Sequence, residues 1–138
     1  DGGAAAALLE ETAAAAKAQS GYDIGPIRDM SRLSPEGKQL RWRLAAANHT
    51  AGFEKLPEGG IVPFLIDWSC NEQPHPSETS PGGCSLESLH AFHPDPPALA
   101  RLLASLGASA CLAAPPERAP APRLEAKLKT PKGIVTLA

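Results

Sequence analysis

The sequence lacks long apolar runs, a strong net charge and abundant aromatic residues, and each absence excludes a class of protein. Aromatic residues make up 4% of the 138 residues, and the formal net charge is −2. No apolar run approaches the roughly 18 residues that a membrane span needs. Lys and Arg are scattered rather than clustered, which argues against a nucleic-acid surface. We therefore expect a globular protein with a core of Leu, Ile, Val and Ala, and neither membrane nor nucleic acid as partner.

Cysteine usage favours a reducing compartment. Cys70, Cys84 and Cys111 make an odd count, so an oxidising compartment would leave one thiol unpaired. We expect reduced cysteines in an intracellular protein, cytoplasmic or organellar, with a Cys70–Cys84 bridge as the alternative. The Ala-rich start has no basic leader, which argues against a signal peptide. Because the chain begins at Asp1 and not at Met, we expect a fragment, a processed form or the ordered part of something longer.

The first half of the chain predicts one helix followed by three strands. Alanine-rich sequence with early acidic residues and a late lysine is typical of a helix, and a Ser-Pro-Glu-Gly turn separates two alternating runs. The predicted elements are a helix over 4–19 and strands over 27–33, 39–46 and 61–68.

The second half predicts a strand, a helix and three more strands. Leucines recur at helical spacing after Asp95, which suits the N-cap position because two prolines follow it. A Thr-Pro-Lys-Gly turn indicates a closing hairpin. The predicted elements are a strand over 85–92, a helix from about 95 to 106, a strand over 108–113, a proline-rich loop over 115–122 and hairpin strands over 124–129 and 134–138.

This order predicts an α+β fold of paired β-α-β-β-β modules that form a cup-shaped mixed sheet, with the first strand of the first module missing. The first module spans residues 1–70, an irregular linker spans 71–83, and the second module spans 84–138. The two hairpins are expected to differ in position between the halves, so the repeat is architectural. A ferredoxin-like sandwich is the alternative, and it fits the second half less well because no second helix follows.

Several stretches carry a resemblance to a known family, and together they cover nearly the whole chain. The chain resembles the glyoxalase-like domains of the vicinal oxygen chelate superfamily. The stretches are Pro35-Glu36-Gly37 with Leu40-Arg41-Trp42-Arg43-Leu44, Pro63-Phe64-Leu65-Ile66-Asp67-Trp68 with His75-Pro76-Ser77, Gly83-Cys84-Ser85-Leu86, and the closing hairpin with Thr130-Pro131-Lys132-Gly133.

The resemblance implies an open cup that holds a divalent ion in metal-dependent members. The ligands there are a His on the first strand and a Glu on the last strand of each module. In this chain the second module has Ser88 and Thr136 at those positions, and the first module offers Asp67 alone. The ligand set is therefore incomplete within this sequence, and the cofactor stays unknown, with a divalent metal as the candidate.

Asp67 is the first candidate for catalysis, because it interrupts an apolar strand. Facing the cup, it could act as a general base or as a single metal ligand. The structural alternative is an ion pair with Arg41 or Arg43 on a neighbouring strand. The two arginines lie on the face of their strand opposite Trp42, where they could bind a carboxylate or phosphate if that face lines the cup, or else meet solvent.

Three further residues are candidates for substrate binding. His75 lies between two prolines in the linker, where it could reach over the cup, or else fold the loop through bonds to the backbone. Ser88 and His90 alternate on the first strand of the second module.

The sequence therefore predicts a glyoxalase-like domain that binds a small molecule in the cup, with an anionic molecule as the candidate. By resemblance the chemistry would be that of a lyase, isomerase or dioxygenase. The alternative is a non-catalytic protein-interaction or scaffold domain, because an unpaired sheet edge invites a strand from a second copy or another partner.

Overall fold

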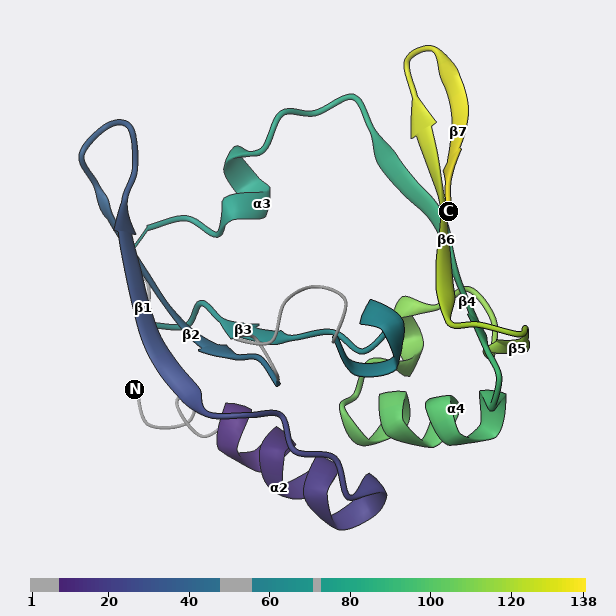
Figure 1. Cartoon of the computed structure of the whole chain (residues 1–138). Helices are drawn as coiled ribbons and strands as arrows, with labels where there is room; N and C mark the ends of the chain where they lie inside the picture. The colour runs from purple at the N-terminus through teal and green to yellow at the C-terminus, as the bar shows by residue number, and fades with distance from the viewer. Residues whose placement is uncertain (1–7, 48–55, 71–72) are drawn as a thin grey trace.

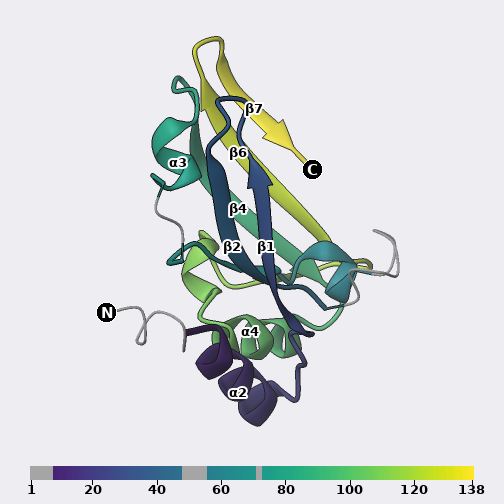
Figure 2. The ribbon, with the colours of Figure 1, turned by 90° about the vertical axis from the view of Figure 1, so that its left-hand side faces the viewer.

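A computed structural model describes residues 8–47, 56–70 and 73–138 of the chain. Two β-sheets lie on either side of the molecule, and helices α2 (Leu8–Ser20) and α4 (Pro96–Ser105) lie together at one end of them (Figure 1). A view from the side shows the same arrangement, with the strands running away from the two helices (Figure 2). The predicted α+β class is confirmed.

The first sheet has the strand order β1-β2-β3, all antiparallel. Strands β1 (Ile27–Leu33) and β2 (Gln39–Ala45) form the predicted hairpin. Strand β3 (Leu65–Asp67) is shorter than the predicted strand over 61–68. Pro57–Gly60 form a 3-10 turn, η2, and Pro63 lacks the N–H that a ladder needs. Ile61 and Val62 are instead buried in the core.

The second sheet has the strand order β5-β4-β6-β7 and is mixed, because β5 (Glu117–Arg118) runs parallel to β4 (Ser85–His93). Strand β6 (Arg123–Thr130) pairs antiparallel with β4, with a register shift between Leu86 and Ser88. Strand β7 (Gly133–Leu137) closes the predicted hairpin.

The predicted strand over 108–113 is wrong. Gly107, at φ 68, ends helix α4, and Ser109–Cys111 form a 3-10 turn, η3. Alanine-rich sequence has little β preference, so the chain turns here rather than extending. Cys111, the last residue of this turn, is exposed. The short strand β5 lies instead inside the predicted proline-rich loop.

The linker contains one helical turn, α3 (Pro76–Thr79), where we expected no regular structure. The histidine before it caps the turn, since the ring of His75 accepts the N–H of Ser77 and the side chain of Glu78 accepts the N–H of His75. This reciprocal arrangement is a capping box, and it explains how so short a turn forms. Residues 4–7 of the first predicted helix and 48–55 of the loop before η2 lie outside the described residues.

The core lies where the two helices meet the near ends of both sheets. Small residues on α2, such as Ala16, allow the leucines of α4 to approach closely, and Leu99 is 1% exposed. The hydroxyls of Ser20 and Ser105 join the helices at 2.9 Å. The far ends of the sheets are exposed, so the helices hold the two sheets together.

The hairpins differ in position between the two halves when β5 is counted as a strand. The hairpin β1–β2 follows α2 directly, whereas β6–β7 follows α4 only after η3 and β5. Counted in this way, β7, which carries Thr136, is the third strand after its helix, as is β3, which carries Asp67.

Two further findings concern the described residues. None of their helices is long and apolar enough to cross a membrane. Cys70, Cys84 and Cys111 are free and exposed, so Cys70 and Cys84 are not bridged.

Candidate functional site

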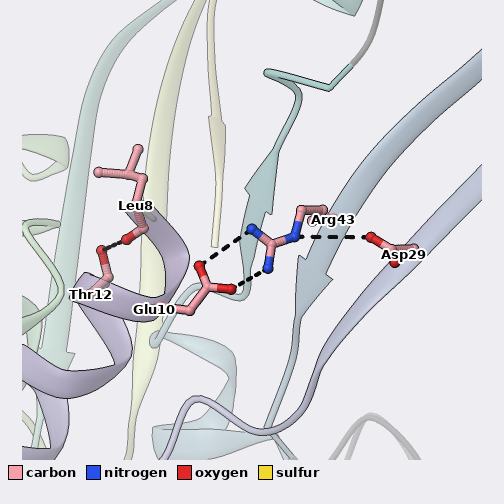
Figure 3. A network of polar contacts seen from close by, with 5 residues as sticks. All are labelled: Leu8, Glu10, Thr12, Asp29 and Arg43. Atoms are coloured by element: carbon pink, nitrogen blue, oxygen red, sulfur yellow. Dashed lines mark hydrogen bonds and ion pairs between the residues drawn. The ribbon is translucent and has the colours of Figure 1, made fainter. Parts of the chain in front are cut away.

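Arg43 lies at the centre of a carboxylate cluster on the face of the first sheet that α2 covers. Its guanidinium makes a two-pronged contact with Glu10 of α2, and its Nε lies 3.9 Å from Oδ1 of Asp29 on β1 (Figure 3). The pairing with Glu10 raises the pKa of Arg43 and lowers the pKa of Glu10. The cluster therefore ties the first helix to the sheet.

Asp67 belongs to the same face. It is the cross-strand neighbour of Arg43, it is buried at 7% exposure, and its charge helps to raise the pKa of Arg43. Its Oδ1 accepts the N–H of Ser69 at 2.8 Å, while Oδ2 is buried with no hydrogen-bond partner among the described residues. These surroundings resemble the structural alternative, in which Asp67 is a carboxylate that lies beside an arginine of the neighbouring strand. The catalytic and metal-binding roles of Asp67 stay predictions.

The described side chains do not form a metal-ligand set. Among residues 8–47, 56–70 and 73–138 no three His, Cys, Asp or Glu side chains come together. A transition metal requires more ligands than Asp67 alone supplies.

Trp42 and Trp68 form an aromatic cluster on the opposite face of the first sheet. Their ring centroids lie 5.1 Å apart, and the ring of His75 meets Trp68 edge-on at 5.9 Å. His75 thus joins the linker to this face of the sheet, in addition to capping α3. Arg41 and Arg43 alternate with Trp42 along β2 and so project from the other face.

An apolar cavity of about 420 Å³ lies at the end of the Trp42 face nearest to η2. Leu44 contributes to it from β2 and Phe64 from the position just before β3, while Val62 and Leu56 come from the segment around η2. Tyr22, after the end of α2, also lines it. Burial, followed by the charges of Asp23 and Glu58, raises the pKa of Tyr22, which favours the protonated hydroxyl.

The second sheet presents a polar face that includes Ser88 and His90. Ser88 is the cross-strand partner of Lys127, and His90 is the partner of Glu125. One step along, the guanidinium of Arg123 lies 3.6 Å from the ring centre of Phe92. Sequence reasoning missed the β6 side chains, although polar residues alternate with apolar ones along Arg123–Thr130.

The predicted site residues thus fall into three places. Arg43 and Asp67 lie together under α2, with Arg41 further along the same face, where it bonds to Gln39 at 3.1 Å. His75 lies on the other face of that sheet, and Ser88 and His90 lie on the second sheet. The cavity beside η2 contains none of these six.

The fold and this geometry define a mixed α+β domain of two sheets with a ligand-sized apolar cavity against one of them. A family model described as a glyoxalase-like domain matches residues 4–107, which is more than half of the chain. The chain belongs to this glyoxalase-like family of the vicinal oxygen chelate superfamily. No curated protein and no solved structure gave a significant match. The closing hairpin lies outside the matched residues, so its resemblance stays a prediction.

Proposed function

We propose that this glyoxalase-like domain binds a small, largely apolar organic molecule in the cavity lined by Leu44, Val62 and Phe64. The observation that carries the proposal is the cavity itself. Its volume of about 420 Å³ lies in the range of about 300–1,000 Å³ that is typical of small-molecule sites. Its lining is apolar apart from a few polar groups, which is also typical, and Tyr22 is the lining residue whose side chain can donate a hydrogen bond.

An anionic group on the ligand would find cations further along the same sheet face. A second cavity of about 490 Å³ lies under α3, and its lining includes two cations, Arg32 and Lys38, together with the carboxylate of Glu36. Leu40 lines this cavity and Leu44 lines the first, so the two are four residues apart along β2, or about 13 Å. A ligand with an apolar body and a distal carboxylate would span both. Lyase, isomerase or dioxygenase chemistry on it is the family expectation.

The test is a fragment screen followed by ¹³C-methyl NMR on the wild-type protein and on Ala46→Phe. Ala46 lines the cavity, so the phenyl ring should fill it. Ser31→Phe is the matched control, because Ser31 pairs with Arg41 and adds the same bulk to the opposite face. We expect the best fragment to lose at least tenfold in affinity in Ala46→Phe and to bind Ser31→Phe normally. Equal binding to all three proteins would overturn the proposal.

Asp67→Ala tests the predicted catalytic and metal-binding role. If Asp67 is structural, the variant should bind fragments and divalent ions as the wild type does while losing about 1–3 kcal/mol of stability. Loss of stoichiometric metal binding in a folded Asp67→Ala protein would support the metal role instead.

A second candidate function, contact with another protein, is favoured by the outer edge of β1. Six of its seven residues are exposed, including Met30 and Leu33, and among the described strands it pairs only with β2. Such an edge can accept a further strand from a second copy. Light scattering at increasing protein concentration should show a dimer of the wild-type protein, and Met30→Lys should abolish that dimer. A wild-type protein that stays monomeric at every concentration would contradict the homo-oligomer.

A further inference from the structure

A third cavity, which is polar and has a volume of about 430 Å³, lies between the C-terminal end of α2 and helix α4. Its charged and polar lining includes Gln19, Tyr22, Glu58, His93 and Arg101. Tyr22 lines the apolar cavity as well, so the two cavities adjoin at this residue. No part of the proposed function uses Glu58, His93 or Arg101.

His93 holds the carboxylate of Glu58 in place. Its Nε2 lies 2.8 Å from Oε2 of Glu58, and the imidazole is buried at 8% exposure. The other ring nitrogen, Nδ1, lies 3.0 Å from the backbone N–H of Asp95 and 2.9 Å from its carbonyl oxygen. Since both nitrogens are bonded, the ring cannot turn without loss, and a fixed ring fixes its carboxylate partner.

Glu58 has a costly backbone conformation. Its φ of 50° and ψ of 43° lie in the left-handed region, which is unfavourable for residues other than glycine, and residues held in such conformations cluster at active sites and ligand clamps. Its side chain is 43% exposed, and Oε1 has no hydrogen-bond partner among the described residues. One oxygen is thus anchored by His93, and the other is available to a ligand.

We propose that this cavity binds a small zwitterion of the amino-acid type. The ammonium group would pair with Glu58 beside the Tyr22 ring, where the charge of Asp23 adds to the negative potential that acts on the tyrosine. The carboxylate would pair with Arg101 of α4, which lines the same cavity. His93 is a positioning residue, because it acts on the ligand only through Glu58.

The cavity lies on the helix side of the second sheet, away from the polar face described above. His93 alternates with Phe92, so it shares its side of β4 with Ala91, which packs in the core with the leucines of α4. The zwitterion site is therefore separate from Ser88 and His90, and it shares one described lining residue, Tyr22, with the apolar cavity. Either proposal can fail without the other.

Three probes with one carbon skeleton test the ligand class: alanine, alaninamide and propionate. They carry both charges, the cation alone and the anion alone. In ¹⁵N NMR titrations of the full chain we expect alanine to bind most tightly, with shifts at Tyr22, Glu58 and Arg101. Binding of either single-charge probe as tight as that of alanine would overturn the proposal, and so would no shift in this cavity with any probe.

Substitutions at Glu58 test the anchor. Glu58→Gln should weaken alanine binding at least tenfold, while the matched control Glu117→Gln, on exposed strand β5, should leave it unchanged. Glu58→Gly keeps the test decisive if Glu58→Gln folds poorly, because glycine tolerates a φ of 50° and should fold well without binding alanine. Wild-type affinity in either Glu58 variant would contradict the assignment.

A rescue experiment tests the positioning role of His93. His93→Leu should weaken alanine binding, whereas His93→Gln should restore much of it, because the glutamine amide can still donate to Glu58. Equal alanine affinity in the two folded variants would show that His93 serves only the packing of β4.

Discussion

At the residue scale, Arg43 shows what sequence alone can and cannot predict. Alternation along β2 placed Arg43 opposite Trp42, and the structural alternative paired it with Asp67 on the next strand. Its contact with Glu10 joins residues 33 positions apart and depends on how α2 packs on the sheet. Periodicity assigns a side chain to a face, whereas the identity of its partner depends on tertiary packing.

Arg43→Met should return the pKa of Glu10 toward its ordinary value of 4.5. The pKa of Glu10 is lowered in the folded protein, so the ion pair stabilises the fold at pH values above the ordinary pKa of a glutamate. This stabilisation is lost as the pH falls through the pKa that Glu10 has in the folded protein. A ¹³C-carboxyl NMR titration measures the pKa directly. Arg41→Met is the matched control and should leave the pKa of Glu10 unchanged. If the pKa of Glu10 were also unchanged in Arg43→Met, the ion pair between Arg43 and Glu10 would not form in solution.

Tyr22 is the single tyrosine of the chain, so its ionisation can be followed by ultraviolet absorbance. We expect a pKa above the ordinary value of 10.0, because burial and the charges of Asp23 and Glu58 disfavour the phenolate. Because its pKa is raised on folding, protonated Tyr22 contributes stability to the fold at pH values below 10.0, and this contribution is lost as the pH rises through the pKa of the folded protein.

Glu58→Gln should lower the Tyr22 pKa relative to wild type, because it removes one negative charge. Glu36→Gln, in the turn of the first hairpin, should not. A Tyr22 pKa at or below the ordinary value in the wild-type protein would contradict its placement between the two cavities.

At the element scale, hairpins and capped helices were predictable because their signals are local. The Ser-Pro-Glu-Gly turn marked β1 and β2, and the Asp95 side chain caps α4 by accepting the N–H of Ala98. Strand β3 and the segment over 108–113 were predicted less well, since the periodicity of a short apolar run does not distinguish a strand from a helical turn. The capping box of α3 was missed because His75 takes the place of the usual Ser or Thr.

Gly25 controls how the segment after α2 approaches the end of β2. It has a φ of 81°, and an added Cβ would lie 2.9 Å from the carbonyl oxygen of Ala46. Gly25→Ala should therefore destabilise the protein by about 2 kcal/mol or more, since crowding adds to the cost of the left-handed conformation. Gly37→Ala has a similar φ but no neighbour within 4 Å, so in urea unfolding it should cost less; equal costs would contradict the close approach.

Among the residues of helix α4, Leu99 should contribute most to the stability of the protein. Leu99→Ala removes a side chain that is 1% exposed, so we expect a loss of about 2–5 kcal/mol. Leu8→Ala, at 59% exposure on α2, is the matched control and should cost little. Denaturant unfolding of the two variants measures the difference, and similar losses would contradict a core centred on α4.

At the scale of the whole molecule, the fold class was predictable and the candidate site was not. Element order implied two strand-rich halves, each with a helix, and the family match agrees with that reading. The apolar cavity combines Tyr22, Leu44, Leu56 and Phe64 from separate segments. The spacing of these residues in the sequence does not predict that they line one cavity, because the path of residues 57–64 depends on the turn η2 and not on a strand.

The most direct test of the central claim is the measurement of intermolecular NOEs between the best-binding fragment and the methyl groups of the protein. The account predicts NOEs to Leu44, Leu56 and Val62, which line the apolar cavity. A fragment that binds with NOEs to Leu103 and Leu112 instead, which line a different cavity beside α4, would contradict it.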